Sequence, residues 1–425
     1  MSKPSKHLLA LAVSAACLAP ATALATNGYF SHGYGTHSKG LAGAGAALPM
    51  SSMDAATNPA NMVHVGNRLD LGAALFSPQR EYTVENPPAG GFGLAPGNVE
   101  SDSDYFLIPH IGWNKMLNDE SSVGVTVYGN GGMNTDYPDD VAGTGQATFG
   151  GTSGAGVNLE QLFVNGSYAR KINDKASWGV SAIAAYQRFK ATGLAAFAPF
   201  SSDDTNLTDN GHDDSFGFGA RLGVQGEVAP GLRLAASYQT EMSMDEFDKY
   251  KGLFAEQGGF DIPASAVIGL AFDVTPASTL VFDIQKIWYS DVASIANPML
   301  PNLAPGSLGT DDGPGFGWDD MTVYKLGYQW ATSDDMTWRV GVSTGDQPIP
   351  SSEVMFNILA PAVMEEHLTF GFTKAVGTSN EFNFAAMYAP KSSVKGINPL
   401  EASGQQTIEL EMVQYELEAS YSWKF

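Results

Sequence analysis

The end of the chain alternates between apolar and polar side chains. The apolar positions are Tyr415, Leu417, Ala419, Tyr421, Trp423 and Phe425, and the positions between them are Glu416, Glu418, Ser420, Ser422 and Lys424. A repeat of two residues predicts a β-strand with one apolar and one polar face. In an outer-membrane β-barrel the apolar face meets lipid and the polar face lines the lumen. Because an aromatic residue ends the pattern, we expect the barrel-assembly machinery to recognise Phe425.

The beginning of the chain has the features of an export signal. Lys3 and Lys6 precede an apolar run at 8–13, and an A-x-A cleavage site follows at 23–25. We therefore predict a signal peptide over residues 1–25 and a mature chain that starts at Thr26. The single cysteine, Cys17, lies inside this signal, and Ser14 is a poor residue for lipoprotein processing before Cys17. The mature chain is thus expected to contain no disulfide.

The composition favours strands that cross a membrane over a soluble enzyme. Only 16% of residues are charged, against roughly 25% in an average domain. After residue 25 no apolar run reaches the length of about 20 residues that a membrane helix needs. The formal net charge of −23 argues against nucleic acid or anionic lipid as a direct partner. Acidic outer loops fit either simple solvation or binding of lipopolysaccharide through divalent cations.

Turn signals divide the chain into fourteen strands. Tight polar turns are predicted at 117–120, 173–175, 229–231, 275–277, 333–335 and 377–380, because Gly, Pro, Asn, Asp and Ser favour such turns. Long loops rich in Gly, Pro and Asp are predicted at 85–101, 137–157, 193–213, 243–262, 293–317, 347–363 and 395–406. The prediction is an all-β, antiparallel, 14-stranded transmembrane barrel over residues 67–425, with a soluble all-β fold as the alternative.

Residues 26–66 do not alternate and are expected to form a plug. The segment is small and weakly charged, as at 40–47, which reads GLAGAGAA. A barrel of fourteen strands encloses a lumen too wide for its own wall side chains to fill. We therefore expect this segment to fold inside the lumen, although a disordered periplasmic tail is the alternative.

Several motifs, in order, resemble one family of outer-membrane channels. They are Tyr29-Phe30, the GLAGAGA run at 40–46, Asn58-Pro59-Ala60, the segment 282–288 that ends in Trp288, Trp318-Asp319-Asp320 with 324–327, and Arg339-Val340-Gly341 leading to Asp346 and Pro348. The chain resembles the FadL family of channels for long-chain fatty acids and other hydrophobic compounds. The spacing from Asp346 to Pro348 is one residue shorter than the family pattern. The resemblance implies a monomer with Asn58, Pro59 and Ala60 in the plug.

The resemblance also implies that ligand leaves sideways through a kink in the third strand. That strand is predicted to run through Val123–Tyr128 into Gly129, Asn130, Gly131 and Gly132. Three glycines in four positions weaken a strand and permit a bulge. We expect these four residues to form a lateral gate with the plug near Asn58-Pro59-Ala60 close to Gly131 and Gly132. An ordinary start of a loop is the alternative.

Apolar residues in loops that should be polar suggest a capture site. The candidates are Leu194, Phe197, Phe200, Phe247, Leu253, Phe254, Met355 and Phe356. Packing of the loops on one another would explain them equally well. Arg188 and Lys190 are candidates for binding a fatty-acid carboxylate. The scarcity of basic residues keeps an uncharged aromatic hydrocarbon as an alternative ligand.

Signals of catalytic chemistry are weak. The histidines after residue 25 have no metal-ligand spacing, and no Ser/His/Asp arrangement is evident, although a triad assembled across strands stays open. We expect no metal, no cofactor and no enzyme activity. The leading hypothesis is an importer of hydrophobic compounds in a Gram-negative outer membrane. A general porin for polar solutes and a lipid hydrolase are the alternatives.

Overall fold

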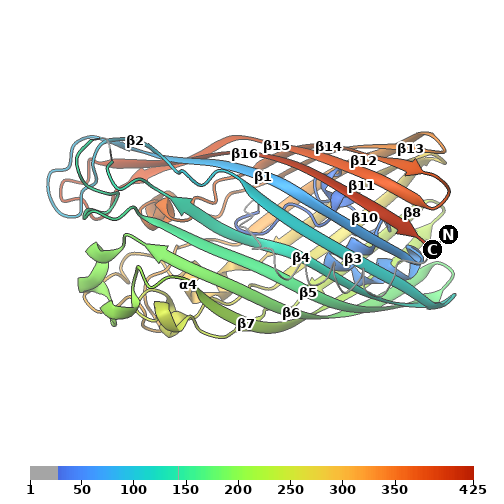
Figure 1. Cartoon of the computed structure of the whole chain (residues 1–425), viewed down its shortest axis with the longest axis horizontal. Helices are drawn as coiled ribbons and strands as arrows, with labels where there is room; N and C mark the ends of the chain where they lie inside the picture. The colour runs from blue at the N-terminus through green and yellow to red at the C-terminus, as the bar shows by residue number, and fades with distance from the viewer. Residues whose placement is uncertain (1–26, 142) are drawn as a thin grey trace.

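The computed structural model describes residues 27–141 and 143–425. The predicted signal peptide at 1–25, with Cys17, and the expected first mature residue, Thr26, lie outside the described residues. The described chain forms an elongated barrel of tilted strands. The loops gather at one end of the barrel, and the C-terminus lies at the other end (Figure 1). The structure therefore has the all-β architecture that the alternating sequence predicts.

Fourteen of the sixteen strands in the described residues build a closed antiparallel wall. Each wall strand pairs with the next along the chain, and β16 pairs with β1 from Arg68↔Lys424 to Glu85↔Thr407. The short β2 extends the edge of β1, and β9 pairs with β7. The wall strands are β1 (Arg68–Glu85), β3 (Phe106–Asn118), β4 (Ser121–Asp136), β5 (Gly156–Asn173), β6 (Ala176–Thr192), β7 (Asp213–Ala229), β8 (Leu232–Gln239), β10 (Ser265–Thr275), β11 (Ser278–Ile287), β12 (Met321–Ser333), β13 (Met336–Gly345), β14 (Glu366–Val376), β15 (Asn380–Ile397) and β16 (Thr407–Lys424), and the two short ones are β2 (Gly97–Glu100) and β9 (Ser243–Met244). The predicted count of fourteen barrel strands is confirmed.

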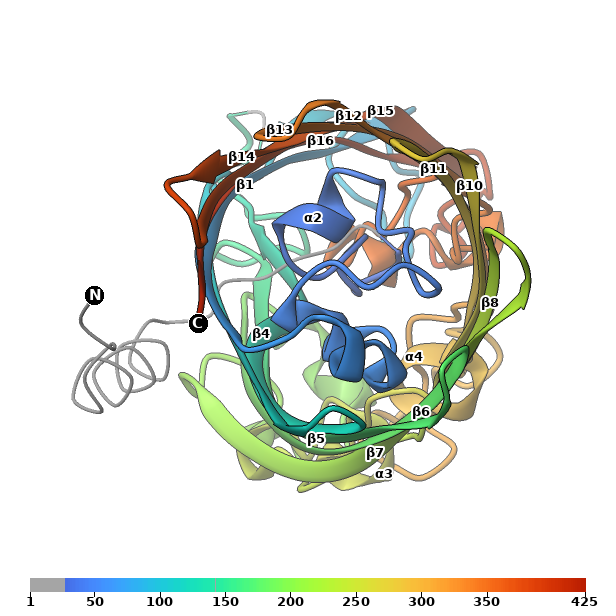
Figure 2. The same cartoon turned by 90° about the vertical axis from the view of Figure 1, so that its right-hand side faces the viewer.

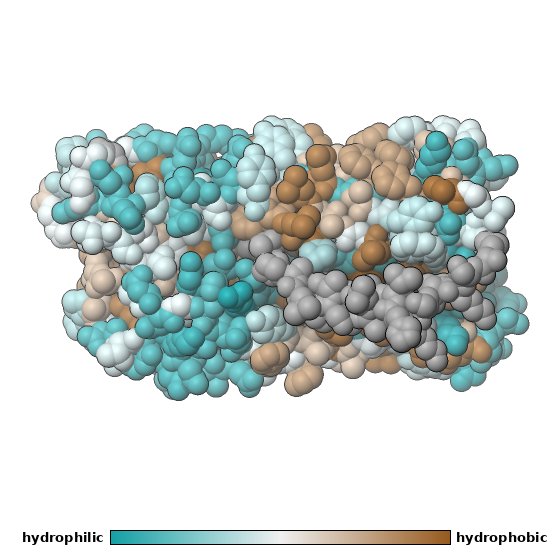
Figure 3. Space-filling model, viewed as in Figure 1, coloured by the Kyte–Doolittle hydropathy of each residue, from teal (hydrophilic) through white to brown (hydrophobic). Residues whose placement is uncertain are grey.

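The alternation of β16 separates an inner from an outer face. Glu416 and Glu418 are 3% and 2% exposed, whereas Tyr415 and Leu417 are 46% and 53% exposed. The carboxylates thus point inward and the apolar side chains point to the membrane. Figure 3 shows brown side chains across the wall between two teal ends, with the deeper teal region at the end that carries the long loops.

The six predicted tight turns all join consecutive wall strands. For example, Asp174 and Lys175 connect β5 to β6, and Asp334 and Asp335 connect β12 to β13. These turns lie at the end of the barrel near the C-terminus, and the long loops lie at the opposite end (Figure 1). This arrangement places the short turns on the periplasmic side and the long loops outside.

Short helices occur in the loops and inside the ring. They are α2 (Thr36–Lys39), η1 (Ser52–Ala56), η2 (Pro59–His64), η3 (Ala195–Phe200), η4 (Asp204–Asn206), η5 (Asp248–Tyr250), α3 (Ala255–Gly258), η6 (Tyr289–Asp291), α4 (Ala293–Ala296), η7 (Ser351–Glu353) and η8 (Phe356–Ile358). Among the residues that the structure describes, no helix has the length and apolar character needed to span a membrane.

The segment 27–66 lies inside the ring of strands. Viewed along the barrel, α2 and the blue helical turns of η1 and η2 occupy the lumen (Figure 2). Most of these residues are buried, including the small residues of the stretch at 40–47. Small side chains let the segment approach the wall closely. Ala42 N, for example, donates to Thr369 Oγ1 at 2.9 Å.

Candidate ligand pathway

An apolar recess lies among the loops at the outer end of the barrel. Of the predicted capture residues, five line it: Leu194, Phe197, Leu253, Phe254 and Phe356. Phe189, Phe316, Leu308 and Leu359 complete much of the lining, around about 510 Å³ of space between protein atoms. We call this the outer recess. Residues from four separate loops and the end of β6 thus converge on one apolar surface.

The other predicted capture residues lie elsewhere. Phe247 and Met355 are fully buried in the core between the loops, and Phe200 packs against that core from its edge. Their positions agree with the alternative explanation, in which these side chains pack the loops against one another.

The prediction for Arg188 and Lys190 needs correction. On β6 the side chain of Phe189 points inward and is buried, so its two neighbours point to the outer face of the barrel, away from the recess.

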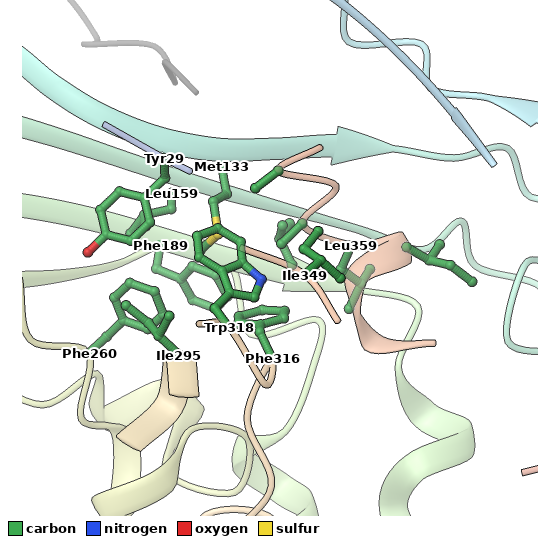
Figure 4. Close-up of a cluster of buried hydrophobic side chains, with 14 of the residues drawn as sticks. Tyr29, Met133, Leu159, Phe189, Phe260, Ile295, Phe316, Trp318, Ile349 and Leu359 are labelled. Carbon is green, nitrogen blue, oxygen red and sulfur yellow. The ribbon is translucent and has the colours of Figure 1, made fainter. Parts of the chain in front are cut away.

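Aromatic side chains lead from the outer recess toward the middle of the barrel. The ring centroids of Phe254 and Phe260 are 4.9 Å apart, and Phe260 lies 6.1 Å from Tyr29 of the inner segment. On the other side, Phe316 lies 6.2 Å from Trp318. Figure 4 shows Tyr29, Phe260, Phe316 and Trp318 converging on one apolar cluster. These ring contacts form a path of aromatic side chains from the loops to Tyr29 of the inner segment.

A second, smaller cavity adjoins this aromatic cluster at Trp318. It has about 330 Å³ of space between atoms and is lined by Gly28, Phe76, Pro78, Arg80, Gly132, Met133, Asn134, Trp318, Ala360, Pro361, Ala362 and Met412. We call it the inner chamber. Apart from Gly132, sequence reasoning assigned none of these residues to a site. The available signal was the alternation of β1, where Phe76, Pro78 and Arg80 occupy successive inward positions.

The strand β4 leaves its neighbour β3 after Val127, five residues before Gly132, the first β4 residue that lines the inner chamber. The register of β3 with β4 runs from Asn118↔Ser121 up to Ile111↔Val127 and ends there. Above that point β4 pairs with β5, and the register shifts between Gly129 and Gly131. Asn130 is therefore the extra residue of a bulge, which bends a strand. All of residues 126–135 are buried, unlike the alternating strands around them.

The inner segment replaces β3 as a partner of the bent part of β4. Phe30 forms a β-bridge with Gly131. The amide of Gly132 donates to Tyr29 O at 3.0 Å, and the amide of Ser31 donates to Asn130 O at 2.9 Å. A Cβ atom on Gly131 would overlap the carbonyl group of Tyr29, so this close approach requires glycine.

The Asn58-Pro59-Ala60 element lies beside other strands than predicted. Pro59 lies against Gly179 of β6, and Asn58 lies against Gly223 of β7. Asn58 Nδ2 donates to Ala46 O at 2.9 Å, and its Oδ1 accepts from Ala60 N at 3.0 Å, which caps η2. The expected proximity of this element to Gly131 and Gly132 is therefore wrong. Tyr29 and Phe30 occupy that position instead.

A buried ionic cluster fastens the inner segment to the wall. Lys39 Nζ lies 2.9 Å from Glu416 Oε1 and 2.8 Å from Glu418 Oε2, and Thr36 Oγ1 donates to Glu418 at 2.8 Å. Burial alone would lower the pKa of Lys39, but the two carboxylates raise it above its ordinary value. On the adjacent strand β1, the amide of Ser52 donates to Asp70 Oδ2 at 2.9 Å.

Replacing Lys39 by Met is expected to loosen the inner segment. Two buried carboxylates then lose their cation, and breaking a buried pair costs roughly 3–5 kcal/mol. Hydrogen exchange should show faster exchange of the amides at 36–47, while the wall strands remain protected. Lys391→Met is a matched control, because Lys391 also bridges two glutamates, Glu81 and Glu411, but is 52% exposed. Its loss should cost about 1 kcal/mol or less. Equal effects of both variants would contradict a fastening role for Lys39.

Within residues 27–141 and 143–425, no three His, Cys, Asp or Glu side chains come close enough together to hold a metal ion. His32 and His367 stack with ring centroids 5.7 Å apart, but a third ligand does not accompany them. Beside the two apolar cavities, the described part of the lumen contains a more polar cavity between the inner segment and the wall, with Arg221 and Lys325 in its lining.

Comparison with known proteins identifies related chains. A model of the family described as outer membrane protein transport protein (OMPP1/FadL/TodX) matches residues 12–396. The long-chain fatty acid transport protein of Salmonella typhi is 23% identical over 349 residues, which is 73% of this chain and 77% of that protein. Its counterpart in Escherichia coli strain K12 is 22% identical over 372 residues, 76% of this chain and 78% of that protein.

Solved structures share the barrel. The crystal structure of the P. putida toluene transporter TodX matches with a TM-score of 0.67 at 17% identity. The match covers 93% of this chain and 99% of the TodX chain. The crystal structure of a Pseudomonas aeruginosa FadL homologue matches with a TM-score of 0.69 at 16% identity. The match covers 94% of this chain and 100% of the homologue's chain.

Three observations identify the same class of protein. They are the closed 14-stranded wall, its lipid-facing side chains and the family match over residues 12–396. The protein is a multi-pass β-barrel of the Gram-negative type of outer membrane. The chain belongs to the outer membrane protein transport (OMPP1/FadL/TodX) family of channels for hydrophobic compounds.

Proposed function

We propose that this protein imports hydrophobic compounds by capture outside and lateral release into the membrane. Ligand binds in the outer recess, passes Phe316 and Trp318 into the inner chamber, and leaves between β3 and β4. The observation that carries the proposal is the position of the inner chamber, which is lined by Gly132 and Met133 on the part of β4 that has left β3. Residues 129–132 act as the lateral gate.

The polarity of the lumen favours a sideways route over an axial one. An alkyl chain gains about 0.8 kcal/mol for each CH₂ group that leaves water. The axial route from the inner chamber to the periplasm crosses the segment 27–66, which acts as the plug and carries the buried charges around Lys39. The lateral route leads from the apolar chamber into hydrocarbon. A hydrophobic molecule therefore stays in apolar surroundings only if it leaves through the wall.

The proposal involves binding and passage without chemical conversion. Fatty acids and aromatic hydrocarbons are both in the range of ligands, because relatives are long-chain fatty acid transport proteins and a solved structure with the same fold is a toluene transporter. The barrel functions as a monomer in a membrane that bears lipopolysaccharide. Phe425, whose amide donates to Asn67 O at 3.1 Å beside the first wall strand, is the contact for assembly.

The outer recess can be tested by replacing two of its aromatic side chains. Phe197→Ser and Phe254→Ser together should weaken the binding of hydrophobic ligands, since full burial of such a side chain is worth roughly 1.5–3 kcal/mol. The measurements are equilibrium binding to purified protein and uptake by cells that produce it. Phe218→Ser is the matched control, because Phe218 is 76% exposed on the outer face of β7. Wild-type binding in the double variant would assign Phe197 and Phe254 to loop packing.

A further inference from the structure

The polar cavity of the lumen lies between the inner segment and the strands from β7 to β12. It has about 440 Å³ of space between protein atoms. The inner segment contributes Gly33, Tyr34 and Thr57 to its lining, and the wall contributes Arg221, Gln239 and Lys325 among others. The two cations are 5% and 4% exposed, and no Asp or Glu lines the cavity. The cavity therefore has two buried positive charges in its lining and no carboxylate.

Arg221 of β7 has neutral surroundings. Its Nη2 donates to Oε1 of Gln239, its register partner on β8. The ion pairs of the described residues do not include Arg221, whereas Arg68, another buried arginine of the lumen, binds Asp70 at 2.7 Å. A buried cation is costly unless a negative charge accompanies it. The described protein groups do not supply that charge to Arg221.

The side-chain amide of Gln239 has a free donor in the same place. Its Oε1 accepts from Arg221, so this bond fixes which end of the amide is the oxygen. Its Nε2 is buried and has no acceptor among the described residues, and the residue as a whole is 1% exposed. Buried amide N–H groups normally find an acceptor in the protein or in an ordered molecule. The lining thus presents an unpaired N–H beside an unpaired cation.

Lys325 of β12 adds the second positive charge. Its Nζ donates to His32 O at 2.8 Å, which holds the ammonium group against the inner segment. Asp283 is its register partner on β11, but the Asp283 carboxylate does not line the cavity. Its Oδ2 instead accepts from the amides of Gly45 and Ala46, each at 2.9 Å. The carboxylate beside Lys325 is therefore directed to the inner segment.

We propose that the polar cavity binds a small inorganic anion of the size of chloride, held by Arg221, Gln239 and Lys325. An ammonium group, a guanidinium and an amide N–H are all hydrogen-bond donors, and together they complement an anion. A water molecule satisfies the amide but leaves the guanidinium without a counter-charge. Ser237 and Ser265 add hydroxyl groups to the lining. The site is separate from the outer recess and the inner chamber and does not depend on the proposed function.

The position of the site gives the anion a structural task. In the ring of fourteen wall strands, β8 is seven strands away from β16, so the cavity faces the lumen from the side opposite the cluster around Lys39. Among the described residues, the ion pairs between the inner segment and the wall are those of Lys39 with β16. An anion at Arg221 neutralises the wall where the inner segment packs against β7 and β8. It thereby fastens the segment on its second side.

Bromide tests the site directly, because it replaces chloride and is located by anomalous X-ray scattering. Crystals of the wild-type protein and of Arg221→Gln are grown in sodium bromide. We expect an anomalous peak within hydrogen-bonding distance of Arg221 and Gln239 Nε2 in the wild type, and none at that position in the variant. An empty cavity in the wild type would overturn the proposal. A peak of equal height in both proteins would overturn the assignment to Arg221.

Hydrogen exchange tests the structural task in solution. Amides at 33–34 and 56–57 are followed in sodium chloride and in sodium gluconate of equal ionic strength, since gluconate is too large for the site. At a chloride concentration ten times the dissociation constant, exchange through opening of the inner segment should be about 10-fold slower than in gluconate. Arg221→Gln should exchange at the same rate in both salts. Equal rates in both salts for the wild type would contradict the fastening role.

Arg339→Gln is the matched control. Arg339 is also a buried cation of the lumen, at 6% exposure, but it does not line the polar cavity. This variant should keep the chloride response of the wild type, and loss of the response would show that any buried arginine gives it. A chloride response that persists in Arg221→Gln would equally overturn the proposal. Heat-modifiable migration in gels verifies that each variant folds, and the bromide measurement on the wild type needs no variant.

Discussion

Removal of residues 27–66 is expected to convert the protein into an open, ion-conducting pore. The change joins Thr26, the residue after the predicted signal peptide, directly to Asn67. This segment contains α2, η1 and η2, which lie inside the barrel (Figure 2). Without them, inward polar side chains such as Glu416, Glu418 and Asp70 would line a water-filled passage. Planar-bilayer recording should show large, steady currents from the deletion variant and small or absent currents from the full-length protein.

Two outcomes of this recording would contradict the proposal. Equally low conductance in the deletion variant would show that the segment is not what closes the lumen. Large steady currents from the full-length protein would instead support the general porin. Heat-modifiable migration in gels provides the folding control. The pairing from β1 to β16 involves wall strands alone, so we expect the deletion variant to form the closed barrel.

Deletion of Asn130 is expected to abolish uptake while leaving capture intact. In the register of β4 with β5, Gly129 pairs with Leu162 and Gly131 pairs with Gln161, so Asn130 is the single extra residue. Without it the ladder becomes continuous, and β4 can follow β3 beyond Val127 because the bend has lost its cause. The opening closes, and uptake of hydrophobic compounds should fall to the background of cells that lack the protein. Binding to the outer recess, measured on purified protein, should remain.

The control for this deletion keeps the length of β4. Asn130→Ala loses the hydrogen bonds from Tyr34 Oη to Asn130 Oδ1 at 2.8 Å and from Asn130 Nδ2 to Gln161 Oε1 at 2.9 Å. It retains the extra residue and hence the bend, so most uptake should survive. Normal uptake by the Asn130 deletion variant would rule out this part of the wall as the exit.

The sequence predicted the wall well because its signals are local. Alternation over one strand fixes which face meets lipid, as in β16, and a tight turn such as Asp174-Lys175 needs only two suitable residues. The bulge at Asn130 was predictable for the same reason, because glycines on both sides of a residue weaken the ladder. These properties depend on a few neighbouring residues and not on what lies across the lumen.

The interior was less predictable because its contacts join distant parts of the chain. The inner chamber combines Phe76 of β1 with Met133 of β4 and Trp318 of an outer loop, and alternation cannot say which loops fold over which strands. The error for Arg188 and Lys190 arose differently. The prediction rests on the basic character of these two side chains alone, whereas the buried Phe189 shows that its neighbours on β6 face outward. The alternation of β1 likewise predicts that the side chain of Arg80 points into the lumen.

The plug bonds to both sides of the place where the ring closes. Ser52 binds Asp70 on the first strand, and Lys39 binds Glu416 and Glu418 on the last, about 380 residues later in the chain. These partners come side by side only when β1 and β16 have paired. The plug is therefore expected to seat late in biogenesis, after insertion and ring closure. Its seating then acts as an assembly checkpoint, because an unfinished barrel cannot offer both anchor points.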